Sequence, residues 1–570
     1  MKKIFLKTIG IIALCSVTAG CIKETMPEGA TQTKKQVAES TFALEGILRG
    51  LPAAMMTSGW SGYYSTYDNW HTDFGMPAIH LYTEYMLNDL AVMGDEPGYN
   101  RFYQSSMNRG QDDTKAVTAY YWDVYYKWIK IANDLIIVVD PSSANSTQKA
   151  YLGQALAYRA AFYLDLARLY SPKEVTDPYA LGKGYKIPDA IKDLTVPIIT
   201  EKTDEATARK NPRATRKEMY EFILKDLSDA EEYLKGQTFS YTVPSLTLVY
   251  GLKARAYIEM GYWSETPKED FQQAIKYANL AITEGGRTPL TKDQWQDPTN
   301  GFNNGASNSA WIWGQTLASE NQANLLTFTA HLSNEAAWGY APGAQIGADR
   351  KFYESINDTD WRKASWLSPE FIADPDAEEF ADVYKFSGGT SGRKGFIYGT
   401  SENPAAKAYE SIKFRPAQGN VSDYNVGNCA DHCLMRIEEM YFILAEATAQ
   451  VEGLSQGKQK LEEFVQKYRD PKFKCGANSL ENFLIDDLLY QKRIEFWGEG
   501  ILIYDYKRLN SGFERGYSGT NQAGIFRFNC KGRSPQWNLV ISRGEYQSNT
   551  GVTEELNNPD PTDKIEQWLE

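Results

Sequence analysis

The chain has 570 residues, 42% of them hydrophobic, which suits two or more domains or one large body built from repeats. Its formal net charge is −13, and it becomes more negative by three charges if Lys2, Lys3 and Lys7 leave with a signal segment. Such an acidic protein is not expected to bind nucleic acid or to adhere to anionic lipid headgroups.

The first 21 residues have the pattern of a secretory signal. Three lysines precede an apolar run over 9–17, which is too short for a permanent membrane helix, and Thr18-Ala19-Gly20-Cys21 follows. This ending resembles the lipobox of bacterial lipoproteins, although that motif usually has Leu where this chain has Thr18. The resemblance implies a signal peptide over 1–20 and a lipidated Cys21 whose acyl chains anchor the protein. The alternative is ordinary cleavage without a lipid.

Residues 21–40 are polar and predict a flexible tether, and 41–570 are expected to form one body. In that body apolar residues recur at helical spacing over many stretches. The predicted helical runs lie at 121–136, 152–167, 216–234, 245–262, 268–284, 434–452, 456–469 and 480–509.

Small residues suggest that some of these helices cross closely in pairs. Ala274, Ala278 and Ala281 have the spacing found in the second helix of a tetratricopeptide repeat, and they follow the 245–262 helix. We therefore expect a mostly α fold with degenerate helix pairs over about 115–284 and 434–509.

The segment from about 285 to 430 differs in kind, because it is rich in Gly, Asn, Ser and aromatic residues and its helical periodicity mostly fades. Short stretches such as 346–356 keep that periodicity. Long polar and aromatic loops are where function tends to lie. This irregular insert is the expected ligand-facing half of the molecule.

Metal binding and catalysis have little support in the sequence. Cys429-Ala430-Asp431-His432-Cys433 brings two thiols and an imidazole together, but no second ligand cluster accompanies them, so a local disulfide or unpaired thiols are favoured. Asp358, Asp360, Asp374 and Asp376 are interpreted as solvated loop charges or helix caps rather than a hydrolytic pair. No cofactor motif is present, and we expect no enzyme.

Six segments in order resemble the SusD/RagB family of Bacteroidetes outer-membrane lipoproteins. They are Trp122–Ile136, Arg213–Leu227, Leu252–Tyr257, Glu438–Ala447, Gln491–Arg508 and Val540–Glu545. The chain departs from the family pattern at Gln491, at Ile501-Leu502 and at Ser542, positions that look structural.

The resemblance implies a body of tetratricopeptide-like helix pairs with an irregular ligand-binding half. It also implies capture of oligosaccharides at the outer membrane, facing the cell exterior, in partnership with a SusC-like TonB-dependent β-barrel importer.

Glycan binding suits the residue types of two stretches, because aromatic planes cover sugar faces while amides, carboxylates and guanidinium groups bond hydroxyls. The candidate ligand-binding residues are Trp60, Tyr64, Asp68, Asn69, Trp70, Trp338, Tyr340 and Arg393. For each aromatic the competing interpretation is core packing, and for Arg393 it is a solvated loop. Trp313, inside an apolar run, is predicted to be core.

The sequence therefore predicts a lipid-anchored, non-catalytic oligosaccharide-binding protein. A protein- or peptide-binding scaffold without glycan binding is the alternative, and a surface glycosidase is a weaker one. An aromatic-lined site in the insert would favour glycan, whereas an apolar groove along the helix pairs would favour a peptide.

Overall fold

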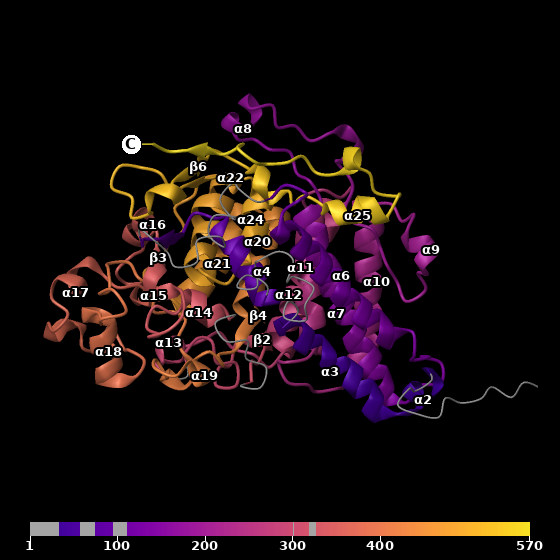
Figure 1. Cartoon of the computed structure of the whole chain (residues 1–570), viewed down its shortest axis with the longest axis horizontal. Helices are drawn as coiled ribbons and strands as arrows, with labels where there is room; N and C mark the ends of the chain where they lie inside the picture. Colours follow the sequence, from indigo (N-terminus) through magenta and orange to yellow (C-terminus); the bar gives the residue numbers. More distant parts are fainter. Residues whose placement is uncertain (1–33, 58–73, 95–110, 300, 319–326, 570) are drawn as a thin grey trace, which may run out of the picture.

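A computed structural model describes residues 34–57, 74–94, 111–299, 301–318 and 327–569 (Figure 1). Paired helices occupy one side of the molecule, and short helices joined by irregular segments occupy the other. None of the helices in these ranges is long and apolar enough to cross a membrane. The mostly α fold expected from the sequence is confirmed.

The long helices pack in sequence-adjacent pairs. Helix α6 (Ala116–Ile136) packs on α7 (Ser146–Tyr170), and α7 packs on α10 (Arg216–Leu234). Helix α11 (Leu246–Met260) pairs with α12 (Pro267–Glu284), and α20 (Glu438–Glu452) pairs with α21 (Leu454–Tyr468).

Local capping explains where several of these helices begin. The Thr215 side chain accepts a hydrogen bond from the Glu218 amide while the Glu218 carboxylate accepts one from the Thr215 amide, so α10 begins as the periodicity predicted. Asn145 and Gln148 form the same reciprocal cap on α7. Pro267 lies in the first turn of α12, where it lacks an N–H that would otherwise be unpaired.

The close helix crossing predicted from alanine spacing is confirmed. Ala274, Ala278 and Ala281 are fully buried, and α12 packs against α11 and also against α20. Because methyl groups are short, two neighbouring helices can approach this face of α12.

Two of the predicted helical runs are wrong in part. The run over 434–452 begins with strand β4 (His432–Arg436), which pairs antiparallel with β2 (Trp311–Gln315). The run over 480–509 is broken into α22 (Leu480–Asn482), a π-helical turn (Phe483–Leu489), α23 (Tyr490–Phe496) and α24 (Leu502–Leu509).

Glycines cause the break between α23 and α24. Gly498 and Gly500 have φ of 78° and 75°, and a Cβ on Gly500 would lie 2.3 Å from the His80 carbonyl oxygen. The amides of both glycines donate 3.0 Å hydrogen bonds to the Glu84 carboxylate. Burial raises the pKa of Glu84 to about 7 although these two amides oppose the shift.

The N-terminal helices are α2 (Lys34–Glu39), α3 (Thr41–Thr57) and α4 (Met76–Tyr85). Helix α2 lies inside the segment predicted to be a flexible tether, so that prediction is wrong for its last residues. The rest of the tether, together with the signal and Cys21, lies outside the described residues.

Short elements make up the insert and the C-terminal part. The helices there are α13 (Lys292–Gln296), α14 (Phe328–Leu332), α15 (Ala341–Ala344), α16 (Arg350–Ser355), α17 (Pro369–Ala373), α18 (Gly389–Tyr398), α19 (Tyr424–Gly427) and α25 (Arg543–Ser548). Strand β1 (Leu90–Val92) pairs with β3 (Ile346–Ala348), and β6 (Phe528–Cys530) lies between β5 (Phe513–Glu514) and β7 (Glu566–Gln567). The helices α8 (Pro178–Gly182) and α9 (Glu205–Ala208) lie in the connection from α7 to α10.

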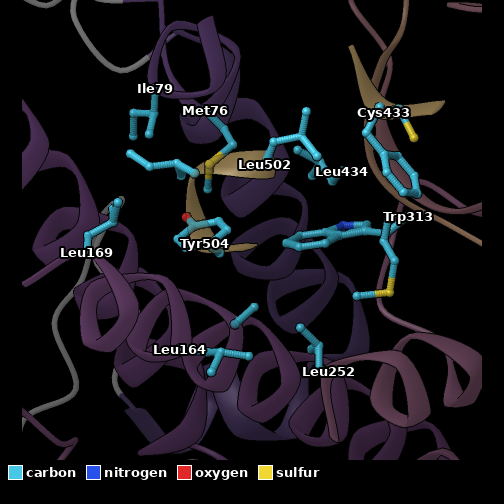
Figure 2. Packing of buried hydrophobic residues seen from close by; sticks show 14 of the residues in the cluster. Met76, Ile79, Leu164, Leu169, Leu252, Trp313, Cys433, Leu434, Leu502 and Tyr504 are labelled. Carbon is cyan, nitrogen blue, oxygen red and sulfur yellow. The ribbon is translucent and has the colours of Figure 1, made fainter. Parts of the chain in front are cut away.

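One large core joins the early helices, the insert and the late helices (Figure 2). Trp313 of β2 lies beside Leu434 of β4 and near Leu252 of α11, with Tyr504 of α24 close by. Only 4% of Trp313 is exposed, so its prediction as a core residue is confirmed.

Buried charges also connect the insert to the helical body. The Glu495 carboxylate accepts hydrogen bonds of 2.6–2.7 Å from Arg436, Arg469 and Arg362, of which Arg362 belongs to the insert. Burial alone would raise the pKa of Glu495, but the charges of Arg469 and Arg436 outweigh it and hold this pKa well below its ordinary value. Removing one partner would leave a buried charge unpaired, which is strongly destabilising.

Candidate ligand-binding site

A cavity of about 410 Å³ lies in the irregular half of the molecule. Its walls come from residues 334–337, from helix α18, from the 400–404 turn and from the 419–422 turn, with Glu410 among the lining residues. Phe396, Pro342, Pro404 and Val421 give it apolar surfaces. A mixture of apolar walls and a few polar groups is typical of small-molecule sites.

Glu335 is one of two buried carboxylates in the wall, and its oxygens are both occupied. Its Oε1 accepts a 2.7 Å hydrogen bond from the Ser387 amide, and its Oε2 accepts one of 2.7 Å from Arg415. Burial raises the pKa of Glu335, and the charge of Arg415 opposes this shift. The ion pair between Glu335 and Arg415 therefore stabilises this wall of the cavity.

Glu410 is the second buried carboxylate in the wall, and only one of its two oxygens accepts hydrogen bonds from described residues. Its Oε1 accepts hydrogen bonds from the Lys407 amide at 2.8 Å and from the Gln345 side chain at 2.9 Å. Its Oε2 receives no hydrogen bond from any residue that the structure describes. Only 2% of the residue is exposed, and burial raises its pKa to about 8.

The backbone at Gln345 supports this arrangement. Gln345 ends α15 with φ of 50°, a left-handed conformation that costs energy for a residue with a side chain. The Gln345 side-chain nitrogen Nε2 donates to Glu410 and also, at 3.0 Å, to the Ala405 carbonyl.

Two turns position neutral polar groups at the cavity. The Thr400 hydroxyl accepts hydrogen bonds from the amides of Glu402 and Asn403, and the Asn420 side chain accepts from the amides of Ser422 and Asp423. The side chains of Asn403 and of Ser391 on α18 make no hydrogen bond to a described residue. These two groups can bond a ligand without losing an existing partner.

Trp338 and Tyr340, predicted to contact ligand, lie in the chain between the lining residues Ala337 and Pro342 but do not line the cavity themselves. Both are half-buried. Trp338 packs on the Gly427 backbone, where an added Cβ would lie 2.4 Å from its ring. Tyr340 stacks on His331, with ring centroids 4.8 Å apart, and His331 stacks in turn on Phe74.

Arg393, predicted to bond sugar hydroxyls from a loop, lies on α18 and is already engaged. Its guanidinium group forms an ion pair of 3.2 Å with Asp376, donates to the Pro375 carbonyl and lies over the Phe386 ring. It does not line the cavity. The predicted residues Trp60, Tyr64, Asp68, Asn69 and Trp70 lie outside the described residues.

Metal binding finds no support in the part of the chain that the structure describes. No three His, Cys, Asp or Glu side chains there form a group that could hold a metal ion. Cys429, Cys433, Cys475 and Cys530 carry thiols rather than disulfides, and His432 is 2.9 Å from the His80 ring nitrogen. The sequence left open a local disulfide or unpaired thiols, and the structure has unpaired thiols at these four cysteines.

A larger hollow of about 1620 Å³ lies on the helical side, between α6, the 197–209 segment and α25. Much of its charged lining is already paired. Arg543 contacts Asp113 at 3.0 Å, Lys130 contacts Asp134 at 2.6 Å, and Arg209 contacts Glu205 at 2.7 Å. Apolar residues such as Trp122, Ile137 and Pro197 line the hollow beside these charged pairs.

Sequence reasoning did not find Glu335, Glu410, Asn403 or Ser391. Each lies in a short segment without periodicity, and they come together only because the insert folds back on itself. The polar turn residues around 400–404 and 419–422 were the available signal, since such turns often border binding sites.

Comparisons with known proteins agree on one family. A SusD-like family described as "Starch-binding associating with outer membrane" matches residues 79–258. SusD-like protein P2 of Formosa agariphila is 25% identical over 539 residues, which cover 89% of this chain and 91% of that protein.

Solved structures share the fold. A SusD-like carbohydrate binding protein from Bacteroides vulgatus aligns with a TM-score of 0.65 at 19% identity, covering 90% of this chain and 98% of the other. Surface glycan-binding protein A from Bacteroides thetaiotaomicron, solved in complex with laminarihexaose, aligns with a TM-score of 0.60 at 15% identity, covering 90% and 98%. The chain is therefore similar in sequence to SusD-like proteins, over residues 79–258 for the family description, and it shares their overall fold.

Proposed function

We propose that this protein captures oligosaccharides in the cavity of its irregular half and delivers them to a TonB-dependent importer of the outer membrane. The observation that carries the proposal is a cavity with apolar walls in which Glu410, Asn403 and Ser391 have hydrogen-bonding capacity to spare. Sugars present apolar faces and hydroxyl rims, and such a lining can satisfy both. Relatives named for starch or glycan binding support the same ligand class.

The cavity favours binding over hydrolysis. Glycoside hydrolysis needs two carboxyl groups that are both available to the bond being cleaved. Here both oxygens of Glu335 are bonded to Ser387 and Arg415, so among the described residues that line the cavity only Glu410 has a carboxyl oxygen to spare. Incubation with a bound oligosaccharide should therefore release no shorter product.

A substitution that fills the cavity tests the proposal. Gly395 lies on α18 and lines the cavity, and a Cβ there would touch only the Thr400 methyl group at 3.7 Å. Gly395→Leu adds a side chain at the cavity without a backbone clash, and leucine also has the higher helix propensity. It should abolish oligosaccharide binding while the protein melts as the parent does.

Gly182→Leu is the matched control. Gly182 is the exposed last residue of α8, and an added Cβ there meets nothing within 4 Å. Binding is measured by calorimetry with the sugar that scores best in a glycan-array screen. If Gly395→Leu binds as tightly as Gly182→Leu, the cavity is not the site and the proposal fails.

Anchoring and partnership complete the proposal. Lipid on Cys21 would keep the protein at the outer membrane, in line with the family description. Co-purification of a β-barrel importer with the tagged protein from detergent-solubilised outer membranes is the test. An unaccompanied protein under those conditions would contradict the delivery step and leave capture standing.

A further inference from the structure

The cavity has a charge character that bears on which sugars it accepts. Among the described residues that line it, two are glutamates and none is a lysine, an arginine or a histidine. We propose that the cavity selects uncharged oligosaccharides and excludes those that carry carboxylate or sulfate groups, with Glu410 bonding a sugar hydroxyl. This inference rests on the proposed function and narrows its ligand class.

The unpaired oxygen of Glu410 is the recognition group. Because Oε1 already accepts from Lys407 and Gln345, the carboxyl is fixed in orientation, and Oε2 remains for a ligand. A ligand hydroxyl can therefore bond this oxygen without displacing an existing partner. Since burial raises the pKa of Glu410 to about 8, the group is protonated at neutral pH and can donate to a hydroxyl oxygen.

Of the cations close in sequence to the lining residues, Arg415, Lys407 and Arg393 have other partners, whereas Lys394, next to Gly395, is exposed and does not line the cavity. Arg415 is bonded to Glu335, the Lys407 ammonium donates to the Met93 carbonyl at 3.2 Å, and Arg393 is paired with Asp376. An anionic substituent entering the cavity would thus lose its water and find no counter-ion among the described lining residues. The negative charge of Glu335 is already matched by Arg415, so an added anion would leave the cavity with an uncompensated charge.

A neutral sugar meets no such penalty. Its hydroxyls can bond Glu410, Asn403 and Ser391, and its apolar face can rest on Phe396 and Val421. Each of these contacts involves a neutral group or the spare oxygen of Glu410, so none needs a charge on the ligand.

The test compares uncharged and anionic sugars of equal length on the purified full protein. The uncharged probes are maltohexaose, laminarihexaose, cellohexaose and xylohexaose, and the anionic probes are hexagalacturonate and a sulfated galactan hexamer. Calorimetry is run on the parent, Gly395→Leu, Glu410→Ala and Glu410→Gln. We expect binding of at least one uncharged hexamer, lost in Gly395→Leu, and no binding of the anionic ones.

The Glu410 variants test whether the Glu410 carboxyl contributes to sugar binding beyond the fit of the sugar to the cavity. Glu410→Ala should lower the affinity for the uncharged sugar roughly two- to twelvefold, which is the range for the loss of one hydrogen bond. Glu410→Gln should weaken it less, because its amide retains a hydrogen-bonding group, and this variant keeps the test valid if the alanine variant unfolds. An uncharged sugar bound equally by the parent and both variants would overturn the role of Glu410.

The remaining outcomes distinguish this inference from the proposed function. An anionic hexamer that binds the parent but not Gly395→Leu would overturn charge selection and leave sugar capture in the cavity standing. An uncharged hexamer that binds Gly395→Leu as well as the parent would overturn both, because the site would lie elsewhere. Absence of binding to all six sugars would refute sugar capture itself.

Discussion

The buried carboxyl of Glu410 makes protein stability depend on pH in a way that can be calculated. Burial raises the pKa of Glu410 from the ordinary 4.5 to about 8 in the folded state. Between these values the folded protein holds a proton that the unfolded chain releases. Stability should therefore be highest below pH 4.5 and fall as pH rises toward 8.

The size of the effect follows from the two pKa values. At 1.36 kcal/mol for each pKa unit, the full displacement corresponds to roughly 5 kcal/mol. About 3.5 kcal/mol of this difference lies between pH 5 and pH 8. Glu410→Gln removes the ionisation while keeping an acceptor for Lys407 and Gln345, so it should be progressively more stable than the parent as pH rises.

Urea denaturation of the parent and Glu410→Gln at pH 5, 6, 7 and 8 measures this difference directly. Glu481→Gln, at an exposed residue of α22, supplies the background for removing one glutamate. The difference in unfolding free energy between Glu410→Gln and the parent should widen by about 3.5 kcal/mol across that range. A gap that stays constant would refute the buried, protonated state of Glu410.

Further predictions concern packing, anchoring and the aromatic stretch near the N-terminus. Ala278→Leu should overpack the contact of α12 with α11 and α20 and cost about 1–3 kcal/mol, and a parental melting curve would contradict that crossing. Cys21→Ala should release the protein from membrane fractions of cells that lack the importer, so unchanged partitioning would rule out a lipid anchor. Trp70→Ala should weaken glycan binding several-fold with the fold intact, whereas a loss of about 3–5 kcal/mol in stability with parental affinity would identify Trp70 as a core residue.

Sequence reasoning found those parts of the fold that local chemistry determines. The bounds of α10 were predicted from apolar periodicity over 216–234, and the structure shows that a capping box at Thr215 and Glu218 fixes its start. Trp313 was assigned to the core because its neighbours in the chain are apolar, and it lies there.

Errors arose where a distant contact decides the local structure. Leu434 and Met435 continue the apolar spacing of the following helix, but pairing with β2 places them in a strand. The break before α24 depends on the close approach of Gly500 to His80, which is 420 positions away in the chain and leaves no mark on periodicity.

The candidate site was the least predictable part for the same reason. Glu335 and Glu410 are 75 positions apart, and whether a carboxyl is ion-paired or has an oxygen to spare depends on Arg415, Ser387 and Gln345. Arg393 illustrates the same dependence on distant contacts. Its polar neighbours in the sequence suggested a guanidinium group available to a ligand, but in the structure this group is ion-paired with Asp376.

The most direct test of the account is a crystal structure of the protein with the uncharged oligosaccharide that binds best. We predict sugar density in the cavity between α18 and the 419–422 turn, with a hydroxyl within hydrogen-bonding distance of Glu410 Oε2. Sugar bound instead in the hollow between α6 and α25, with the cavity unoccupied, would contradict the account.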